Sequence, residues 1–145
     1  MTTATFNDHT KPLVMNHYLD ITSIPSKFSV KDTIDKLETA FRSKGITIYG
    51  RIDQQAEAEK AGLQLKSMEL LLFGNPKAGI PLILHEPLCA LDLPLKVLAW
   101  EGMDGKVWLS YNNFAYLQRR FALPDNLINN VSGAETVIKN TLESK

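Results

Sequence analysis

Lys96-Val-Leu-Ala-Trp-Glu-Gly-Met-Asp-Gly-Lys-Val-Trp-Leu-Ser-Tyr111 consists of two short, mainly apolar runs on either side of a turn. The Asp-Gly pair at 104–105 inside a short loop is a strong hairpin signal. For a loop of two or four residues, one face would carry Leu98, Trp100, Val107 and Leu109, and the other Val97, Ala99 and Trp108. Large apolar groups on both faces predict a hairpin covered on two sides, by helices or by a partner subunit.

The chain before this hairpin alternates between strand and helix patterns. Residues 14–24 alternate with period two, which predicts a half-buried strand that Pro25 ends. A helix with one apolar stripe starts after Ser29, and Gly45 is placed to end it. Residues 46–52 alternate again, residues 54–61 are typical of a short helix, and the apolar run 68–73 suits a central strand.

Helices follow the hairpin. Asn112 or Asn113 can cap the first, and Pro124 can occupy the first turn of the next. A second capping pattern at Ser132 and Glu135 predicts a break or kink near Gly133. The predicted order is strand, helix, strand, short helix, strand, irregular segment, hairpin and two or three helices. We therefore expect a single domain over residues 13–145, preceded by a polar N-terminal tail at 1–12.

Composition excludes several classes of protein. Sixteen Lys and Arg balance sixteen Asp and Glu, so the chain lacks the positive charge on which nucleic-acid binding and basic membrane-surface binding depend. The most apolar stretch, residues 80–100, is interrupted by charged residues and prolines and is not a membrane span. One cysteine and no visible secretory signal favour a reducing, cytoplasmic location.

Residues 73–81 are the least generic segment. Asn75 before Pro76 is typical of a helix or turn that starts just after an apolar strand. Backbone N–H groups at that start, with Lys77 beside them, could hold an anion. The alternative is a tight connection that needs Gly and Pro for its geometry alone, and no phosphate-loop spacing is present.

Metal and cofactor chemistry finds little support in the sequence. His85 and Cys89 stand four residues apart, but Pro87 between them disturbs the helical register that would bring them together. His17 falls on the apolar face of its predicted strand, where a core histidine is favoured over a catalytic base. We expect no cofactor and no stoichiometric metal.

A set of blocks in fixed order carries a family resemblance. These blocks are Arg51-Ile-Asp53, Ala61-Gly-Leu63, Phe73-Gly-Asn-Pro-Lys77, Gly79, Pro81-Leu82, Leu91-Asp-Leu-Pro-Leu-Lys-Val97, Trp100-Glu101, Gly105-Lys-Val-Trp108 and Ser110-Tyr-Asn112. From about Ser29 to Val137 the chain resembles the family called domain of unknown function 302. The resemblance implies an α+β fold of the TATA-binding-protein-like type: a two-layer β-α-β4-α domain with helices packed on a five-stranded, curved, mostly antiparallel sheet. It also implies a homodimer and no established activity.

Three positions depart from the pattern of the family. Gln54 stands where relatives often have His, Ile80 where they commonly have Thr, and Asn113 where they often have Asp. A histidine that served relatives as a general base would therefore be missing here. The fold type does not predict DNA binding, because a fold alone does not carry a function and the net charge opposes it.

The leading functional hypothesis is a homodimeric, non-enzymatic module that binds a small molecule in a groove at one end of the sheet. The candidate lining residues are the least generic polar positions: Asn75, Pro76, Lys77, Asp92, Glu101, Tyr111 and Asn112. One alternative is a small-molecule enzyme that uses Lys77, Asp92, Glu101 or Tyr111 for proton transfer. The other alternative is a structural or protein-interaction domain. If these side chains scatter over different faces, the binding and the enzyme hypotheses both weaken.

Overall fold

The computed structural model of the chain describes residues 19–144. The predicted polar tail, His17 and residues 14–18 of the predicted first strand lie outside these residues. The strands are β1 (Ile21–Ser26), β2 (Thr47–Asp53), β3 (Met68–Gly74), β4 (Leu95–Glu101) and β5 (Val107–Asn112). The helices are α2 (Val30–Ser43), α3 (Gln54–Lys60), α4 (Pro76–His85), the 3₁₀ helix η1 (Pro87–Asp92), α5 (Phe114–Phe121) and α6 (Asp125–Glu143).

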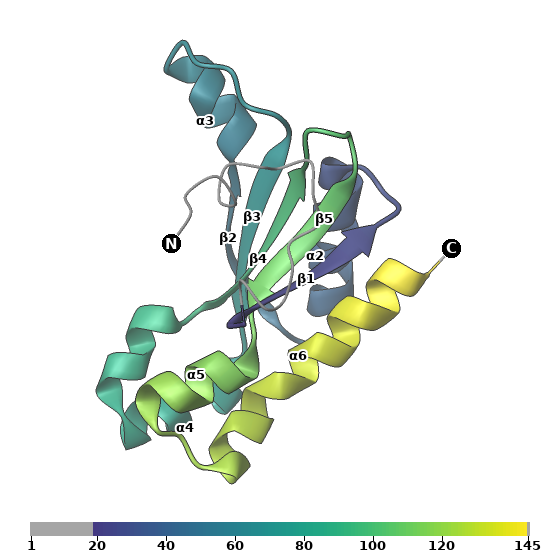
Figure 1. Cartoon of the computed structure of the whole chain (residues 1–145). Helices are drawn as coiled ribbons and strands as arrows, with labels where there is room; N and C mark the ends of the chain where they lie inside the picture. Colours follow the sequence, from purple (N-terminus) through teal and green to yellow (C-terminus); the bar gives the residue numbers. More distant parts are fainter. Residues whose placement is uncertain (1–18, 145) are drawn as a thin grey trace.

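The five strands form one open sheet in the order β1-β5-β4-β3-β2, and each neighbouring pair is antiparallel (Figure 1). This confirms the predicted α+β class and the five-stranded sheet with helices packed on it. Pro25 does not end the first strand as predicted, because β1 continues to Ser26 and Pro25 pairs with Trp108. β1 is an edge strand, where the missing N–H of proline costs no ladder hydrogen bond.

The β4–β5 hairpin is present, but the predicted division of its side chains between two faces is wrong. Glu101 pairs with Val107, so the loop spans residues 102–106, an odd number. Trp100 therefore lies opposite Trp108 on one face, and Ala99 lies opposite Leu109 on the other. The prediction was wrong because it rested on a loop of two or four residues. A change of one residue in the loop length moves every side chain of one strand to the other face.

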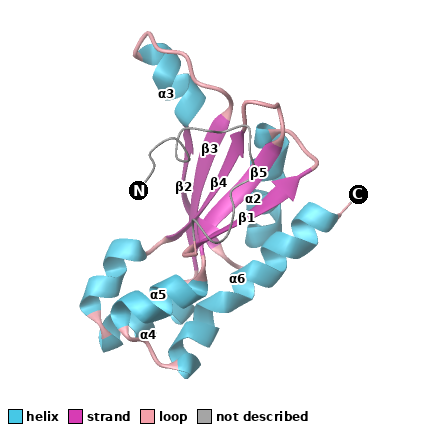
Figure 2. Ribbon diagram, viewed as in Figure 1, coloured by secondary structure: helices cyan, strands magenta, loops and turns pink. Residues whose placement is uncertain are grey.

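Two helices cover one face of the sheet, with α6 running across it beside α2 (Figure 2). Helix α2 begins where the Ser29 side chain accepts a hydrogen bond from the Asp32 backbone N–H, and Gly45 follows its end with a positive φ of 76°. Both ends match the sequence prediction. Helix α6 runs unbroken through Gly133, contrary to the expected break.

The main core lies between this pair of helices and the sheet. The Phe41 ring of α2 stacks on the Phe73 ring of β3, with ring centroids 4.1 Å apart. Buried aliphatic side chains from both layers surround this pair: Val30, Ile34, Leu37, Leu71, Val97, Leu109 and Ile138. The interdigitated aromatic and aliphatic groups supply most of the apolar burial that holds α2 on the sheet.

A second core lies beyond the end of the sheet. The segment expected to be irregular forms α4 and η1 instead, and these pack with α5 and the first half of α6. Its buried residues are Leu82, Cys89, Leu117, Leu123, Ile128 and Val131. Asn75 caps α4 and Pro76 occupies its first turn, as the sequence predicted for a helix start here.

An ion-pair network fastens α2 to the two strands at the β2 edge. Arg51 of β2 donates from Nε to Glu69 of β3 at 2.7 Å and from a terminal nitrogen to Asp35 of α2 at 2.7 Å. Hydrogen bonds from Lys31 and from Arg51 lower the pKa of Asp35 below its ordinary value. Glu69 is 7% exposed, so Arg51 is the cation that compensates for the burial of its carboxylate.

We predict that Arg51→Met lowers the free energy of unfolding by about 2 kcal/mol, because it leaves the buried Glu69 carboxylate unpaired. Urea unfolding followed by circular dichroism measures this loss. Adding Glu69→Leu to Arg51→Met should recover most of the stability, since an apolar pair needs no compensating charge.

Lys60→Met is the matched control for this prediction. Lys60 pairs with Glu57 on the exposed helix α3, and breaking this surface pair should leave the stability nearly unchanged. Equal effects of Arg51→Met and Lys60→Met would contradict the assigned role of the network.

Candidate functional site

The start of α4 carries the first of the sequence-predicted site residues. The Asn75 side chain accepts a hydrogen bond from the Lys77 backbone N–H at 3.0 Å. The backbone N–H groups of Ala78 and Gly79 donate to the Asn75 carbonyl at 2.9 and 2.8 Å, and Pro76 has no N–H. The donors of this helix start are therefore used within the chain, which favours the geometric interpretation of the segment over an anion site.

An open groove of about 440 Å³ lies beside α4. One side comes from the ends of β2 and β3 and from the start of α4, and the other from η1, the segment that leads into β4, and α6. The lining residues are Tyr49, Gly74, Asn75, Pro76, Gly79, Ile80, Ile83, Ala90, Leu93, Pro94, Leu95 and Val131. The volume falls in the range of small-molecule sites, and the walls are almost wholly apolar.

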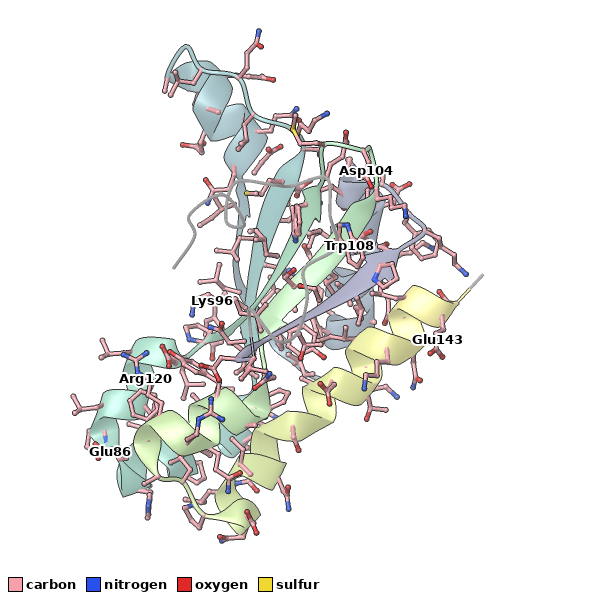
Figure 3. The ribbon with its side chains drawn as sticks, viewed as in Figure 1. Glu86, Lys96, Asp104, Trp108, Arg120 and Glu143 are labelled. Carbon is pink, nitrogen blue, oxygen red and sulfur yellow. The ribbon has the colours of Figure 1, made fainter. Side chains whose placement is uncertain are left out.

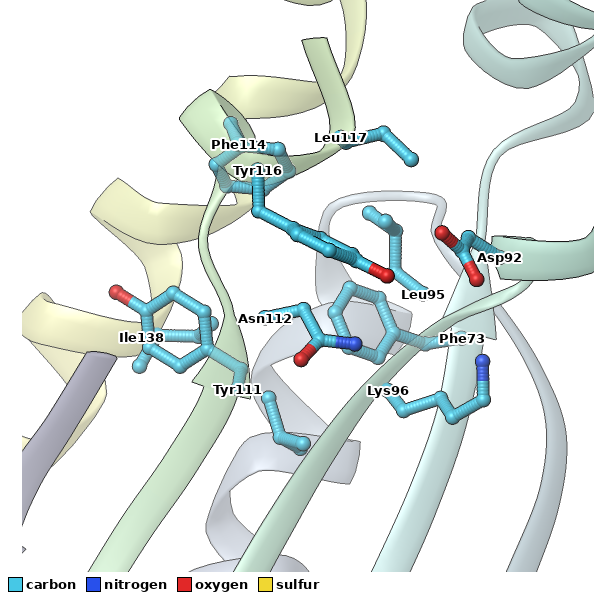
Figure 4. Close-up of a pocket in the computed structure, with 11 residues that line it drawn as sticks. Phe73, Asp92, Leu95, Lys96, Tyr111, Asn112, Phe114, Tyr116, Leu117 and Ile138 are labelled. Carbon is cyan, nitrogen blue, oxygen red and sulfur yellow. The ribbon is translucent and has the colours of Figure 1, made fainter. Parts of the chain in front are cut away.

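A second, much smaller cavity of about 30 Å³ lies under α5 (Figure 4). Asp92, Tyr111 and Asn112, all candidates from the sequence, line it together with Lys96 and Tyr116. This volume holds a single water-sized group and no larger ligand. Leu95 lines both this cavity and the groove, so the two spaces are neighbours.

The polar groups of the small cavity are largely committed to one another. Arg120 donates to both carboxylate oxygens of Asp92, at 3.1 and 3.0 Å, and to the Tyr116 hydroxyl at 2.8 Å. Lys96 donates to the Pro94 carbonyl at 3.2 Å. The Asp92–Arg120 contact ties η1 to α5, which gives Asp92 a structural function at this position.

Tyr111 contributes its ring to the small cavity but turns its hydroxyl away from Asp92 (Figure 4). The hydroxyl donates to Glu135 of α6 at 2.6 Å. Burial, and then this hydrogen bond, raise the pKa of Tyr111 above its ordinary value. A neutral phenol bonded to a carboxylate holds α6 against β5, and it is poorly suited to accept a proton near neutral pH.

The remaining candidates lie apart from these spaces. Glu101 is at the opposite end of β4 from Lys96, next to the hairpin loop, and its carboxylate lies 3.5 Å from the Lys66 ammonium. Figure 3 shows this separation, with Lys96 and Arg120 at one end of the sheet and Asp104 and Trp108 toward the other. Lys77 is exposed, and it is absent from the lining of both the groove and the small cavity.

The two residues weighed as a metal pair are separated by their surroundings. His85 is exposed at the end of α4, whereas Cys89 is fully buried in the second core, with Glu86 in an extended conformation between them. Burial, and then the charges of Glu86 and Asp92, raise the pKa of the Cys89 thiol. Within residues 19–144, no three His, Cys, Asp or Glu side chains gather where they could hold a metal ion.

The three departures from the family pattern have separate positions. Gln54 begins α3, Asn113 caps α5, and Ile80 lines the groove with 47% of its surface exposed. Sequence reasoning missed the apolar walls of the groove, in particular Ile83, Leu93 and Val131. Their signal in the sequence is the same as that of any core residue, so the pattern alone does not separate wall from core.

The fold and this pair of spaces define a two-layer α+β domain with an apolar groove beyond one end of its sheet. The model of the family described as "Domain of unknown function DUF302" matches residues 22–144, and the chain belongs to this family. An uncharacterized conserved DUF302 protein from Bacillus stearothermophilus has a similar crystal structure, with a TM-score of 0.72 and 17% sequence identity. The match covers 86% of this chain and 97% of that one, and it supports the fold.

Longer curated proteins also match. The fluoride-specific ion channel FluC 1 of Brucella suis is 40% identical over 103 residues, which cover 71% of this chain and 41% of that protein. FluC 2 of Brucella melitensis is likewise 40% identical over 103 residues, and these residues make up 38% of its length. This chain therefore spans about two fifths of the length of these relatives. Among residues 19–144, no helix is both long and apolar enough to cross a membrane.

Proposed function

We propose that this protein is a homodimeric small-molecule-binding module and that the groove beside α4 holds the ligand. The groove of about 440 Å³ is the observation that carries the proposal. It has the size of a ligand site, and the cap and the second core fix the elements around it. Asn75 and Pro76, two of the sequence-predicted residues, form part of its wall.

The dispersal of the polar candidates weakens a shared polar site, and catalysis most of all, so the binding proposal rests on the apolar groove. Proton transfer needs an acid or base within reach of one reacting atom. Asp92 is paired with Arg120, the Tyr111 hydroxyl is bonded to Glu135, and Glu101 lies at the other end of β4. The groove itself offers apolar contact in place of titratable groups. The buried free thiol of Cys89 is compatible with the cytoplasmic location that we propose.

We predict that Gly79→Leu prevents ligand binding without unfolding the protein. Gly79 lines the groove inside α4, and a Cβ added there lies 3.9 Å from the nearest atom, a Leu93 methyl group, so the backbone accepts a side chain at this position and that side chain would occupy part of the groove. Native mass spectrometry of the purified protein should show a co-purified small molecule on the wild type that is lost from Gly79→Leu.

Gly133→Leu is the matched control for this experiment. Gly133 is an exposed helical glycine of α6 that does not line the groove, and the substitution raises helix propensity in the same way. This control should keep the ligand. Loss of the ligand from both variants, or from neither, would count against the groove as its site.

The proposed dimer rests on apolar surface that the single chain leaves uncovered. Leu84, Leu88 and Leu91 on α4 and η1 are 80%, 63% and 69% exposed. Trp108 is half-buried on the face of the sheet opposite α2 and α6, whereas Trp100 is 8% exposed. Clustered exposed leucines are unusual on a monomer and are typical of a contact surface, and a symmetric second copy is the commonest partner.

Sedimentation at micromolar concentration should show a dimer for the wild type. Leu84→Glu with Leu88→Glu should give a monomer, because two charges would be buried without partners at the interface. Leu63→Glu, at a residue 66% exposed beyond α3, is the control and should leave the dimer intact. A wild type that sediments as a monomer would contradict the proposed dimer. A double variant that remains dimeric would show that the interface lies on another surface.

A second candidate function follows from the fluoride channels that match this chain. In those relatives, which are named fluoride-specific ion channels, a segment similar to this domain shares one polypeptide with further sequence. We propose that this chain works beside a fluoride channel as a separate binding domain. Domains that share a polypeptide act at a high effective concentration, so the contact between them can be weak. A separate chain that keeps such a contact is therefore expected to bind with micromolar affinity.

Microscale thermophoresis tests this second function with the part of the Brucella suis protein that lies outside the match, solubilised in detergent. Binding of this chain at about 1–100 µM, absent with an unrelated channel in the same detergent, is expected for a contact of this kind. Equal signals with both channels, or none with either, would rule out the association.

A further inference from the structure

We propose that the groove selects an uncharged, mainly apolar molecule and rejects its charged analogues. This inference rests on the proposed binding function and adds the chemical class of the ligand. Of the lining residues, all but Tyr49, Gly74, Asn75 and Gly79 have purely hydrocarbon side chains. Such walls gain free energy by covering apolar ligand surface, and they offer nothing that replaces the water around a charge.

No charged side chain of the described residues lines the groove, and two that lie near it have partners elsewhere. Asp92 and Lys96 line the small cavity, where Asp92 is held by Arg120 and Lys96 donates to the Pro94 carbonyl. Lys77 stands at the start of α4 but does not belong to the groove lining. A charged ligand in the groove would therefore lose hydration without gaining an ion pair.

The helix start beside the groove does not compensate for this absence of charge. A free N-terminal turn could stabilise an anionic group. Here the backbone N–H groups of Lys77, Ala78 and Gly79 donate to the side chain and the carbonyl of Asn75. An anion would have to displace these bonds, so the groove is electrostatically matched to a neutral molecule.

Two neutral polar groups at the rim allow the ligand one or two hydrogen bonds. Tyr49, 52% exposed, brings a hydroxyl that can donate or accept. The Asn75 amide uses its oxygen for the cap, and its N–H₂ group can donate. The class of ligand is thus an aliphatic or aromatic molecule of drug-like size or smaller, with at most a hydroxyl, carbonyl or similar neutral group.

A pair of fluorescent probes tests the charge selectivity directly. N-phenyl-1-naphthylamine is neutral, and 8-anilinonaphthalene-1-sulfonate has the same two ring systems with an added sulfonate. Fluorescence titration of the full chain should give a dissociation constant for the neutral probe at least about tenfold lower than for the sulfonate, because only the sulfonate must be desolvated without a partner.

Three variants locate the bound probe. Gly79→Leu should abolish binding of the neutral probe, and Gly133→Leu should leave it unchanged. Ile80→Thr should weaken it a few-fold, because threonine keeps the branch at Cβ and replaces the ethyl group of the isoleucine by a hydroxyl. Thermal unfolding of each variant checks that the fold is intact.

The outcomes separate the ligand class from the proposed function. If the sulfonate binds as tightly as the neutral probe and Gly79→Leu abolishes both, the groove is a binding site but the inferred class is wrong. If the neutral probe does not bind, or binds Gly79→Leu as well as the wild type, the inference is overturned. The proposed function is tested separately, by whether native mass spectrometry detects a co-purified ligand on the wild type that is lost from Gly79→Leu.

Discussion

Helix α6 is the element on which both hydrophobic cores depend. Its C-terminal half places Ile138 and Leu142 in the core beneath the sheet, and its N-terminal half places Ile128 and Val131 in the core formed with α4, η1 and α5. A helix of 19 residues is about 28 Å long, which is enough to reach past the end of a strand of seven residues. One helix can therefore pack against both the sheet and the α4–η1 segment.

The groove is a consequence of this arrangement. The α4–η1 segment packs on α6 and α5 instead of lying on the sheet, so a seam remains between it and the ends of β2 and β3. Val131, buried in the second core, also lines the seam. The Asp92–Arg120 pair closes the far side of η1 against α5. Rigid packing on one side and an open seam on the other are the conditions of a preformed ligand site.

Local patterns predicted the elements well because local chemistry determines their ends. Ser29, Asn75 and Asn113 each cap a helix with a side-chain oxygen, and Gly45 and Gly62 each follow a helix with a positive φ. The faces of the hairpin were not predictable in the same way. They depend on whether the loop has an odd or even number of residues, and an Asp-Gly pair does not determine the loop length.

The candidate site was harder to predict, because the sequence draws attention to polar residues in apolar surroundings. In the folded chain such residues satisfy one another: Asn75 caps α4, Asp92 pairs with Arg120, Tyr111 bonds Glu135, and Glu101 lies by Lys66.

For Tyr111, which is buried, the partner is necessary, since an unpaired polar group inside a protein costs more than a paired one gains. Among the described residues, no buried side-chain nitrogen or oxygen lacks a hydrogen-bond partner. The groove beside α4 instead presents hydrocarbon surface, and Ile80, Ile83 and Leu93 form its wall only because the second core holds them around an open space.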